Sequence, residues 1–368
     1  MKFDLIAPCY FGTESTAAFE VRRLGAENVK VTDGRIAFSG ADIIAAANLN
    51  LRCAERVLVL LKTYTATTFD ELFDGVSSIL WEELIPADAQ FPVKGSSLSS
   101  TLSSVPACQS IVKKAVVERL KKGHKTLMLP ETGALYKIRF SIRKNVVEIM
   151  MDTSGDGLHK RGYRRNATGA PIKETLAAAI ADLGRVRRDS IVVDPFCGSG
   201  TMVIEAAQKA MNIAPGLRRR FAAEHYTFCP PEVWARQREK ALSEIRMDAA
   251  FEGFGYDIDP AAVALATQNA KLAGVGERCH FELADVRDFA PRPEMIVLTN
   301  PPYGERLGDL ATAAKLAGVL GKALEEHPVT GAYIITADAD LEKHLGKKAN
   351  RRRKLYNGMI PCQVYMYF

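Results

Sequence analysis

Two short segments of this sequence carry residue types that suit chemistry on an amine. The first is Asp194–Thr201, DPFCGSGT, which follows the apolar run SIVV and precedes the run MVIEAA. A glycine-rich turn between a strand and a helix lets the backbone approach a ligand closely, and the helix N-terminus offers free N–H donors. Gly198 and Gly200 are the expected points of close approach.

The second segment is Asn300–Gly308, NPPYGERLG, directly after the apolar run MIVLT. Two successive prolines forbid a helix start and remove two N–H donors. They leave backbone carbonyls beside an amide side chain and an aromatic ring, all of which can accept from or stack on a planar amine. This segment therefore indicates a site that recognises a planar amine.

The glycine turn differs from the common phosphate-binding motifs. A phosphate loop needs Lys followed by Ser or Thr after its last glycine, and a dinucleotide fingerprint needs GxGxxG. This turn reads CGSGT behind an acidic residue. Asp194 would repel a pyrophosphate and suits a cationic or amine-bearing ligand.

Acidic residues also follow two later apolar runs. In GYDIDP, Asp257 is the expected partner of ribose hydroxyls and Asp259 the weaker choice, because a carboxylate at this strand end binds ribose in α/β nucleotide sites. Asp285, after HFEL, has the position of an acceptor for an adenine amino group. A helix cap is an equally open interpretation of each residue.

The elements that must position these residues alternate between strands and helices. Such alternation, with runs as apolar as IVV and MIVL, predicts an α/β fold with a parallel sheet covered by helices on both faces. Asn357–Gly358 predicts a closing antiparallel hairpin. The predicted strands are Ser190–Val193, Phe254–Tyr256, His280–Leu283 and Met295–Leu298, and the predicted helices are Ile172–Leu183, Thr201–Met211 and Pro260–Leu272.

The N-terminal part has a different pattern. Residues 1–58 predict a small α+β unit, and residues 59–155 a second one, with a helix near Thr68–Trp81. A Gly/Ser-rich break is expected over Lys94–Ser104, followed by the helix Cys108–Lys122 and a hairpin that turns at Lys144 and Asn145. Residues 156–170 are the expected linker to a domain over 171–368.

The basic residues are concentrated in one region. Residues 113–165 hold 14 Lys and Arg against 5 Asp and Glu, although the net charge of the whole chain is only +6. A polyanion partner is one explanation, and a solvated charged face is the other. The candidate contacts to a polyanion such as a nucleic acid are Lys121, Lys122, Lys125, Arg143, Lys144, Arg161, Arg164 and Arg165.

The composition excludes several other classes of protein. At 368 residues and 47% hydrophobic content, two or three folded domains are expected and disorder is not. No run approaches the length of about 18 to 20 apolar residues that spans a bilayer. The start of the chain does not have the pattern of a signal peptide, so a soluble, cytoplasmic protein is expected. The seven scattered cysteines predict reduced thiols and neither disulfides nor a metal site.

Together these motifs resemble a known family. The pairing of DPFCGSGT with NPPY is similar to class I S-adenosylmethionine-dependent methyltransferases that act on exocyclic amines of bases. LHKRGYR, APIKETLAAAI and IAPGLRRRF extend the resemblance to the THUMP-domain RNA guanine-N2 methyltransferases. The resemblance implies a ferredoxin-like unit, a THUMP domain and a Rossmann-like methyltransferase domain, in the form that carries a single methyltransferase.

The resemblance also implies a reaction and roles for residues. The cofactor would be S-adenosylmethionine, no metal would be needed, and the product would be N2-methylguanosine in 23S ribosomal RNA. The amide oxygen of Asn300 and the carbonyl of Pro301 would accept from the guanine amine, beside Pro302, and Tyr303 would stack on the base. The residues implied for the cofactor are Asp194, Phe196, Gly198, Gly200, Thr201, Asp257, Ile258, Asp285, Asn300 and Thr175.

Other functions stay open on the sequence. A transfer RNA guanine-N2 methyltransferase would use the same chemistry on another RNA. An adenine-N6 methyltransferase or a protein glutamine methyltransferase would use a similar Asn-Pro-Pro-Tyr loop. An RNA-binding assembly factor without turnover would need the fold alone, although Gly200, Asp257 and Asn300 all remain in place.

Overall fold

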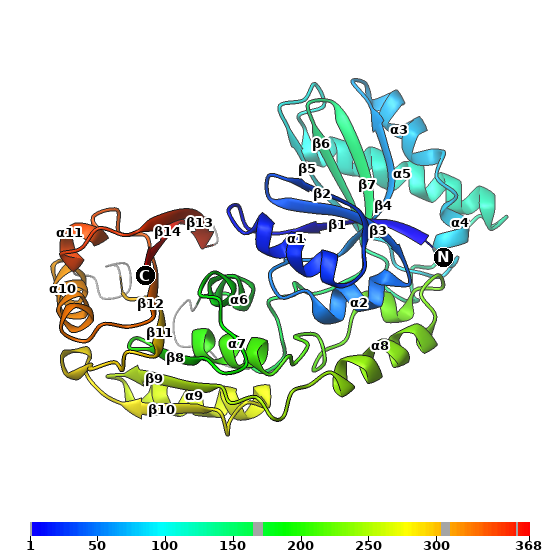
Figure 1. The fold of residues 1–368 in the computed structure, drawn as a ribbon. Helices are drawn as coiled ribbons and strands as arrows, with labels where there is room; N and C mark the ends of the chain where they lie inside the picture. Colours follow the sequence, from blue (N-terminus) through cyan, green and yellow to red (C-terminus); the bar gives the residue numbers. More distant parts are fainter. Residues whose placement is uncertain (1, 165–171, 303–309, 358–359) are drawn as a thin grey trace.

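The computed structural model describes residues 2–164, 172–302, 310–357 and 360–368. These residues form two seven-stranded sheets, one in the N-terminal part and one in the C-terminal part (Figure 1). The predicted α/β fold, with two smaller α+β units ahead of a Rossmann-like domain, is confirmed.

The first sheet joins the two N-terminal units. Its strands run in the order β2-β3-β1-β4-β7-β6-β5, and the β1–β4 pair is the seam between residues 1–58 and the unit that follows. Its strands are β1 Lys2–Pro8, β2 Glu27–Thr32, β3 Arg35–Ala41, β4 Leu58–Thr65, β5 Val93–Leu98, β6 Ile138–Arg143 and β7 Val146–Asp152. Its helices are α1 Glu14–Arg23, α2 Ile43–Asn50, α3 Phe69–Ser77, α4 Trp81–Leu84 and α5 Val105–Gly123.

Two expectations for this part are wrong in detail. The polar stretch predicted as a break contains strand β5, which pairs in parallel with β6 at the edge of the sheet. Only its first residue, Val93, is buried, so the stretch lacks the apolar pattern of a strand. The single helix expected over Thr68–Trp81 is two helices, α3 and α4. The turn predicted at Lys144 and Asn145 is confirmed, with φ of +51° and +63°.

The second sheet has the order β10-β9-β8-β11-β12-β14-β13. The first five strands are parallel, and β14 is antiparallel to both its neighbours, so the predicted closing hairpin is confirmed. Its strands are β8 Ile191–Asp194, β9 Glu252–Asp257, β10 Cys279–Leu283, β11 Met295–Thr299, β12 Gly331–Thr336, β13 Arg351–Asn357 and β14 Ile360–Tyr367. The helices of this part are α6 Glu174–Leu183, α7 Thr201–Ala210, α8 Pro231–Ser243, α9 Pro260–Ala273, α10 Leu310–Glu326 and α11 Leu341–Leu345, with the 3₁₀ turns η1 Ala222–His225 and η2 Val286–Asp288.

The strand order reverses its direction between β8 and β11. From β8 the chain builds outward through β9 and β10, and from β11 it builds outward on the other side. In open α/β sheets a ligand binds in the crevice at this switch point, outside the carboxyl ends of the strands. The segments Asp194–Thr201 and Asn300–Gly308 follow the two strands that meet there.

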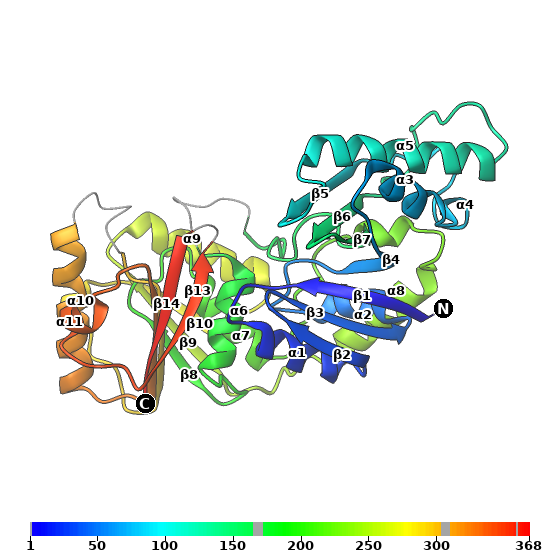
Figure 2. The same cartoon turned by 90° about the horizontal axis from the view of Figure 1, so that it is seen from above.

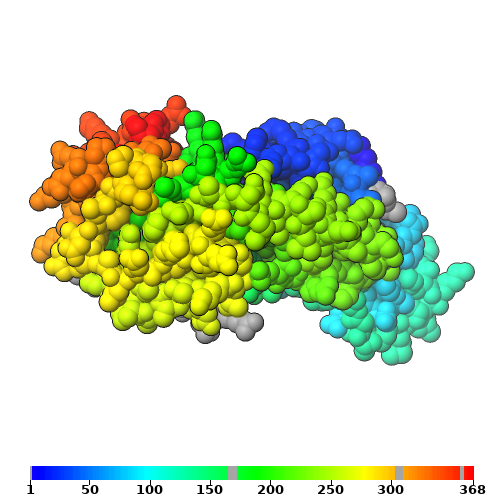
Figure 3. All heavy atoms as spheres, turned by 60° about the horizontal axis from the view of Figure 1, so that its bottom comes forward, coloured from blue at the N-terminus to red at the C-terminus, as the bar shows by residue number. Residues whose placement is uncertain are grey.

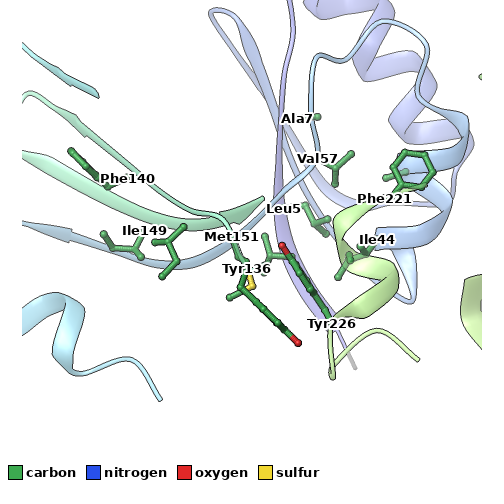
Figure 4. Close-up of a cluster of buried hydrophobic side chains, with 14 of the residues drawn as sticks. Leu5, Ala7, Ile44, Val57, Tyr136, Phe140, Ile149, Met151, Phe221 and Tyr226 are labelled. Carbon is green, nitrogen blue, oxygen red and sulfur yellow. The ribbon is translucent and has the colours of Figure 1, made fainter. Parts of the chain in front are cut away.

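The segment between α7 and β9 ties the two parts of the molecule together. It leaves the second sheet and packs against the first, where Tyr226 stacks on Tyr136 with ring centroids 4.3 Å apart (Figure 4). Phe221 and Trp234, also stacked, belong to the same core as Ile44. In Figure 3 the light green atoms of this segment lie against the blue atoms of the N-terminal unit. This segment therefore belongs to the hydrophobic core of the N-terminal part, whereas the second sheet has separate cores of its own.

The expected linker is well packed over its described residues. Leu158 and Tyr163 are buried, and the Arg219 guanidinium donates to the carbonyls of Gly157 and Lys160. The path of the chain between the two parts is thus fixed by buried contacts as far as Arg164.

The remaining expectations concern cysteines and membranes. All seven cysteines are buried thiols, in agreement with the expectation of reduced cysteines. In the part of the chain that the structure describes, no helix combines the length and the apolar character needed to cross a membrane.

Candidate functional site

The strand register brings the sequence motifs to one edge of the second sheet. Asp194 of β8 pairs with Gly255 of β9, and Val193 pairs with Val297 of β11. Asp257 is the last residue of β9, Asn300 directly follows β11, and Phe196 follows β8 by two residues, so these residues lie at the same carboxyl edge of the sheet.

Hydrogen bonds hold the glycine turn to the neighbouring elements. The Gly198 N–H donates to Oδ2 of Asp257 at 2.8 Å, and the Cys197 N–H donates to the carbonyl of Tyr256 at 2.8 Å. From the other side, Nδ2 of Asn269 donates to the carbonyl of Ser199 at 3.0 Å. The turn is therefore preorganised.

The two glycines of the turn differ in their surroundings. Both have positive φ, +50° at Gly198 and +80° at Gly200. A Cβ at Gly200 would lie 2.9 Å from the ring of Phe281, whereas a Cβ at Gly198 would meet no atom within 4 Å. Gly200 is needed for packing, and Gly198 borders open space of the kind a ligand requires.

This difference gives a matched pair of variants. Gly200→Ala should lower the free energy of unfolding by about 2 to 4 kcal/mol, from backbone strain and overpacking together. Gly198→Ala should lower it by about 1 to 2 kcal/mol, from the backbone alone, yet weaken binding of S-adenosylhomocysteine at least tenfold. Denaturant unfolding and calorimetric titration measure the two effects. Equal stability losses, or unchanged binding by Gly198→Ala, would contradict this assignment.

Asp194 links the glycine turn to the strand end before Asn300. Its side chain is 2% exposed, and Oδ1 accepts from the Thr299 hydroxyl at 2.6 Å and from the Phe196 N–H at 3.0 Å. Burial raises the pKa of Asp194 to about 7, against the opposing effect of the Thr299 hydrogen bond. Sequence reasoning missed Thr299, although a hydroxyl directly before NPPY was visible.

Of the two acids at the carboxyl end of β9, the structure gives Asp259 a local role. Asp259 caps α9 by accepting from the Ala261 N–H at 2.8 Å. Asp257 instead orders two segments of backbone. One oxygen accepts from the Gly198 N–H in the glycine turn, and the other accepts from the Asp259 N–H at 3.0 Å. The next side chain, Ile258, is 68% exposed at this edge.

Asp285 lies at the end of β10 and is already paired. Its carboxylate accepts from the Arg287 N–H at 2.9 Å and from the Arg287 guanidinium at 2.6 Å. The side-chain hydrogen bond lowers the pKa of Asp285 to about 2. It caps η2, so an adenine amine would have to share this carboxylate with Arg287.

Of the segment Asn300–Gly308, which is expected to recognise a planar amine, the structure describes the first three residues. Asn300 and Pro302 are half-buried and Pro301 is buried, directly after β11. Tyr303 lies outside the described residues, as does Arg165.

Two threonines expected at the cofactor have other partners. Thr175 is buried and its hydroxyl donates to the carboxylate of Glu55 in the N-terminal part, so a cofactor contact of this residue stays a prediction. Thr201 is also buried. Its hydroxyl lies 3.3 Å from the Arg164 guanidinium and 3.2 Å from the Ser199 hydroxyl. These contacts give Thr201 a positioning role in the turn.

Two of the arginines expected to bind RNA have partners within the protein. Arg161 is 3% exposed, and its guanidinium donates to the carbonyl of Leu158. Arg164 pairs with Glu174 at 3.0 Å, and this charge opposes the burial that raises the pKa of Glu174 to about 7. The prediction of an RNA contact is therefore wrong for Arg161, whereas Arg164 is partly exposed and its contact stays a prediction. Lys122, Lys125, Arg143 and Lys144 are exposed and Lys121 is half-buried.

A cleft of about 1160 Å³ lies elsewhere, between the N-terminal unit and the second sheet. Its walls include Arg187 and Asp189, just before β8 begins, and residues of α1 such as Arg23. It is therefore at the opposite end of β8 from Asp194, and no residue of Asp194–Thr201 or Asn300–Gly308 lines it.

Comparison with known proteins places each part of the chain. The family model described as RMKL-like, methyltransferase domain, matches residues 161–366. The RlmL ferredoxin-like domain matches residues 4–58, and the THUMP domain matches residues 66–152.

Two curated relatives cover the whole chain. A candidate RNA methyltransferase of Bacillus subtilis, YpsC, is 43% identical and is itself covered to 96%. Ribosomal RNA large subunit methyltransferase K/L of Hahella chejuensis is 32% identical over 100% of the chain, which spans about half of that protein, 53%.

Two solved structures are similar over 100% of the chain. One, from Listeria monocytogenes, is named a predicted N6-adenine-specific DNA methylase; it has 43% identity and a TM-score of 0.94, with 96% of it covered. The methyltransferase SMU.472, solved with S-adenosylhomocysteine (SAH), has 38% identity, a TM-score of 0.93 and 98% coverage.

Proposed function

The chain belongs to the RMKL-like methyltransferases that carry an RlmL-type ferredoxin-like domain and a THUMP domain, and we propose that it methylates the exocyclic N2 of a guanine in 23S ribosomal RNA. Its cofactor is S-adenosylmethionine, and RNA is its class of substrate. The base and the RNA are the proposal. The observation that carries it is the parallel pairing of β8 with β9 and β11, which brings Asp194, Asp257 and Asn300 to one carboxyl edge of the sheet.

The residues at the carboxyl edge fit S-adenosylmethionine. The open space at Gly198 would admit the methionine part beside the buried carboxyl of Asp194, which can attract an ammonium group. Asp257 would hold the ribose, and the exposed Ile258 would pack on the adenine. When bound, the cofactor supplies an electrophilic methyl group on sulfonium sulfur.

The side chain and backbone after β11 would orient the target amine. The lone pair of a guanine amine is delocalised into the ring, so it is a poor nucleophile. Acceptance of its two N–H bonds by the Asn300 amide oxygen and the Pro301 carbonyl would localise the lone pair toward the methyl group. Alignment of nitrogen, methyl carbon and sulfur provides most of the remaining catalysis.

RNA would be held in part by the lysines at the end of α5 and just after it. Lys121 and Lys122 lie in the last turn of this helix, and Lys125 follows with φ of +52°. Replacing all three with Gln should reduce the slope of log Kd against log salt by about two to three, because each phosphate contact releases counterions. Filter binding over a salt series measures the slope. An unchanged slope would remove this lysine cluster from the interface, and Lys30, Lys271 and Lys343, exposed elsewhere, provide a matched triple-Gln control.

Methyl transfer to purified RNAs tests the choice of substrate. The protein is incubated with methyl-labelled cofactor and, separately, 23S ribosomal RNA lacking its modifications and bulk transfer RNA. Label in the ribosomal RNA alone is expected. Label in transfer RNA alone would mean that transfer RNA, and not ribosomal RNA, is the substrate. Binding of cofactor without label in either RNA would favour an assembly factor.

A further inference from the structure

Two half-exposed aromatic side chains meet where the two parts of the molecule touch. Phe11, in the loop between β1 and α1, is 55% exposed, and Tyr356, near the end of β13, is 42% exposed. Their ring centroids are 6.1 Å apart and their planes 67° from parallel. We call these two residues the aromatic pair. Single exposed aromatics are common on protein surfaces, but a pair assembled from distant segments is unusual.

The loop that carries Phe11 is built rigidly. One carboxylate, that of Glu14, accepts from the Gly12 N–H at 2.8 Å and from the Gly34 N–H at 3.0 Å. The Phe11 ring lies against Gly34, where a Cβ would be 3.3 Å from it. The structure thus fixes the backbone beneath a phenyl ring that it leaves largely in solvent.

The same loop is fastened to β13. Gly12 has φ of +88°, and a Cβ there would lie 2.3 Å from the Lys354 carbonyl oxygen. The Gly12 carbonyl in turn accepts from the Arg353 guanidinium at 2.9 Å. The spacing of the aromatic pair therefore depends on a direct contact between the ferredoxin-like and methyltransferase domains.

The pair lies on the side of the molecule where the proposed site opens. Strand β13 is antiparallel to β14, which is antiparallel to β12, so β13 runs in the direction of the parallel strands. Through Gln363 of β14, Lys354 is level with Thr336 at the end of β12, and Tyr356 lies further along. Figure 2 shows β13 and β14 side by side next to α6. Tyr356 therefore extends beyond the same carboxyl edge as Asn300.

Cationic side chains lie next to the pair. Lys354 is exposed on β13 two residues before Tyr356, on the same face of the strand, whereas Arg352 on that face is occupied by Glu342. On the other side, Lys173 lies over the ring of Tyr10, the residue before Phe11, at 5.6 Å, and also pairs with Glu55 at 3.6 Å. Aromatic rings flanked by Lys and Arg are the surface chemistry that binds unpaired nucleotides, with stacking on the base and attraction to the phosphate.

From this arrangement we propose that the aromatic pair stacks on an unpaired base of the RNA next to the target nucleotide, while Lys354 meets the phosphate of that nucleotide. The inference rests on the proposed function, because it names the form of RNA that the site accepts. Extruding a target base leaves its neighbour unstacked, and the aromatic pair replaces the lost stacking. A duplex has no unpaired base to offer.

Binding of two short RNAs without cofactor tests the proposal. The probes are a fluorescently labelled single strand of about 12 nucleotides with mixed sequence and the blunt duplex of the same sequence, titrated at low salt. Phe11→Ala and Tyr356→Ala should each raise Kd for the single strand about fivefold or more, and the double variant more than tenfold. Kd for the duplex should change less than about twofold. Tyr356→Phe should behave as the wild type, because stacking needs the ring and not the hydroxyl.

Phe19→Ala provides the matched control. Phe19 is also 55% exposed but lines the separate cleft on α1, and its loss should leave both affinities unchanged. Unchanged SAH affinity in every variant shows an intact methyltransferase domain. Equal losses for strand and duplex, or no loss for either, would overturn the role of the aromatic pair while leaving the proposed function in place. Failure of the wild type to bind or methylate any RNA would overturn both.

Discussion

Asn300→Ala should lower the rate of methyl transfer about 100- to 1,000-fold while SAH binds as tightly as to the wild type. The amide oxygen acts on the amine of the base, whose partial positive charge grows only as the N–C bond forms. An interaction of this kind stabilises the transition state and not the bound cofactor. Single-turnover transfer and calorimetric titration measure the two quantities separately.

Asn269→Ala is the matched control for this variant. Asn269 is 1% exposed, and its amide donates to the Ser199 carbonyl in the cofactor turn. Its loss should weaken SAH binding and stability, with a smaller effect on transfer at saturating cofactor. If Asn300→Ala lost cofactor affinity in proportion to rate, the amide would belong to the cofactor site instead.

Asp194→Asn should weaken SAH binding by about 10- to 100-fold above neutral pH and remove its dependence on pH. Burial holds the pKa of Asp194 at about 7 in the free protein. An ammonium group pairs with the ionised carboxylate, so wild-type affinity should rise as pH increases through about 7 and level off above it. Titrations between about pH 5.5 and pH 8.5 measure the profile, and an unchanged profile in the variant would exclude Asp194 from the methionine end.

The stability of the free protein should show the opposite trend. The unfolded chain loses the Asp194 proton near 3.8, the ordinary value, whereas the folded chain keeps it up to about 7. The folded state therefore binds more protons in this interval, and stability falls as pH rises from about 4 to about 7. Glu174, with a pKa raised to about 7 by burial, adds to the same trend. Asp194→Asn should remove the contribution of Asp194 to this dependence of stability on pH and leave that of Glu174.

Local patterns in the sequence were sufficient to predict the methyltransferase half of the fold. The runs IVV and MIVL, the glycine turn and Asn357–Gly358 each act within one strand or one connection, so their patterns are visible without the fold. Register then follows from strand pairing, and it aligns Asp257 and Asn300. For the same reason the cap formed by Asp259 could be anticipated as one of two local options.

Features that depend on distant partners could not be predicted. Arg161 and Arg164 look like surface charges in a basic run, and only the fold places Glu205 and Glu174 beside them in the interior. Strand β5 has too few apolar residues to be recognised and exists because β6 provides a partner. The aromatic pair required the contact between the loop after β1 and β13, which no local pattern encodes.

The identity of the methylated nucleoside tests the central claim most directly. Ribosomal RNA labelled by the protein and S-adenosylmethionine is digested to nucleosides and separated by chromatography coupled to mass spectrometry. The label is expected in N2-methylguanosine, and Asn300→Ala should remove it. Label in N6-methyladenosine would contradict the assignment of guanine and would favour the specificity in the name of the Listeria structure.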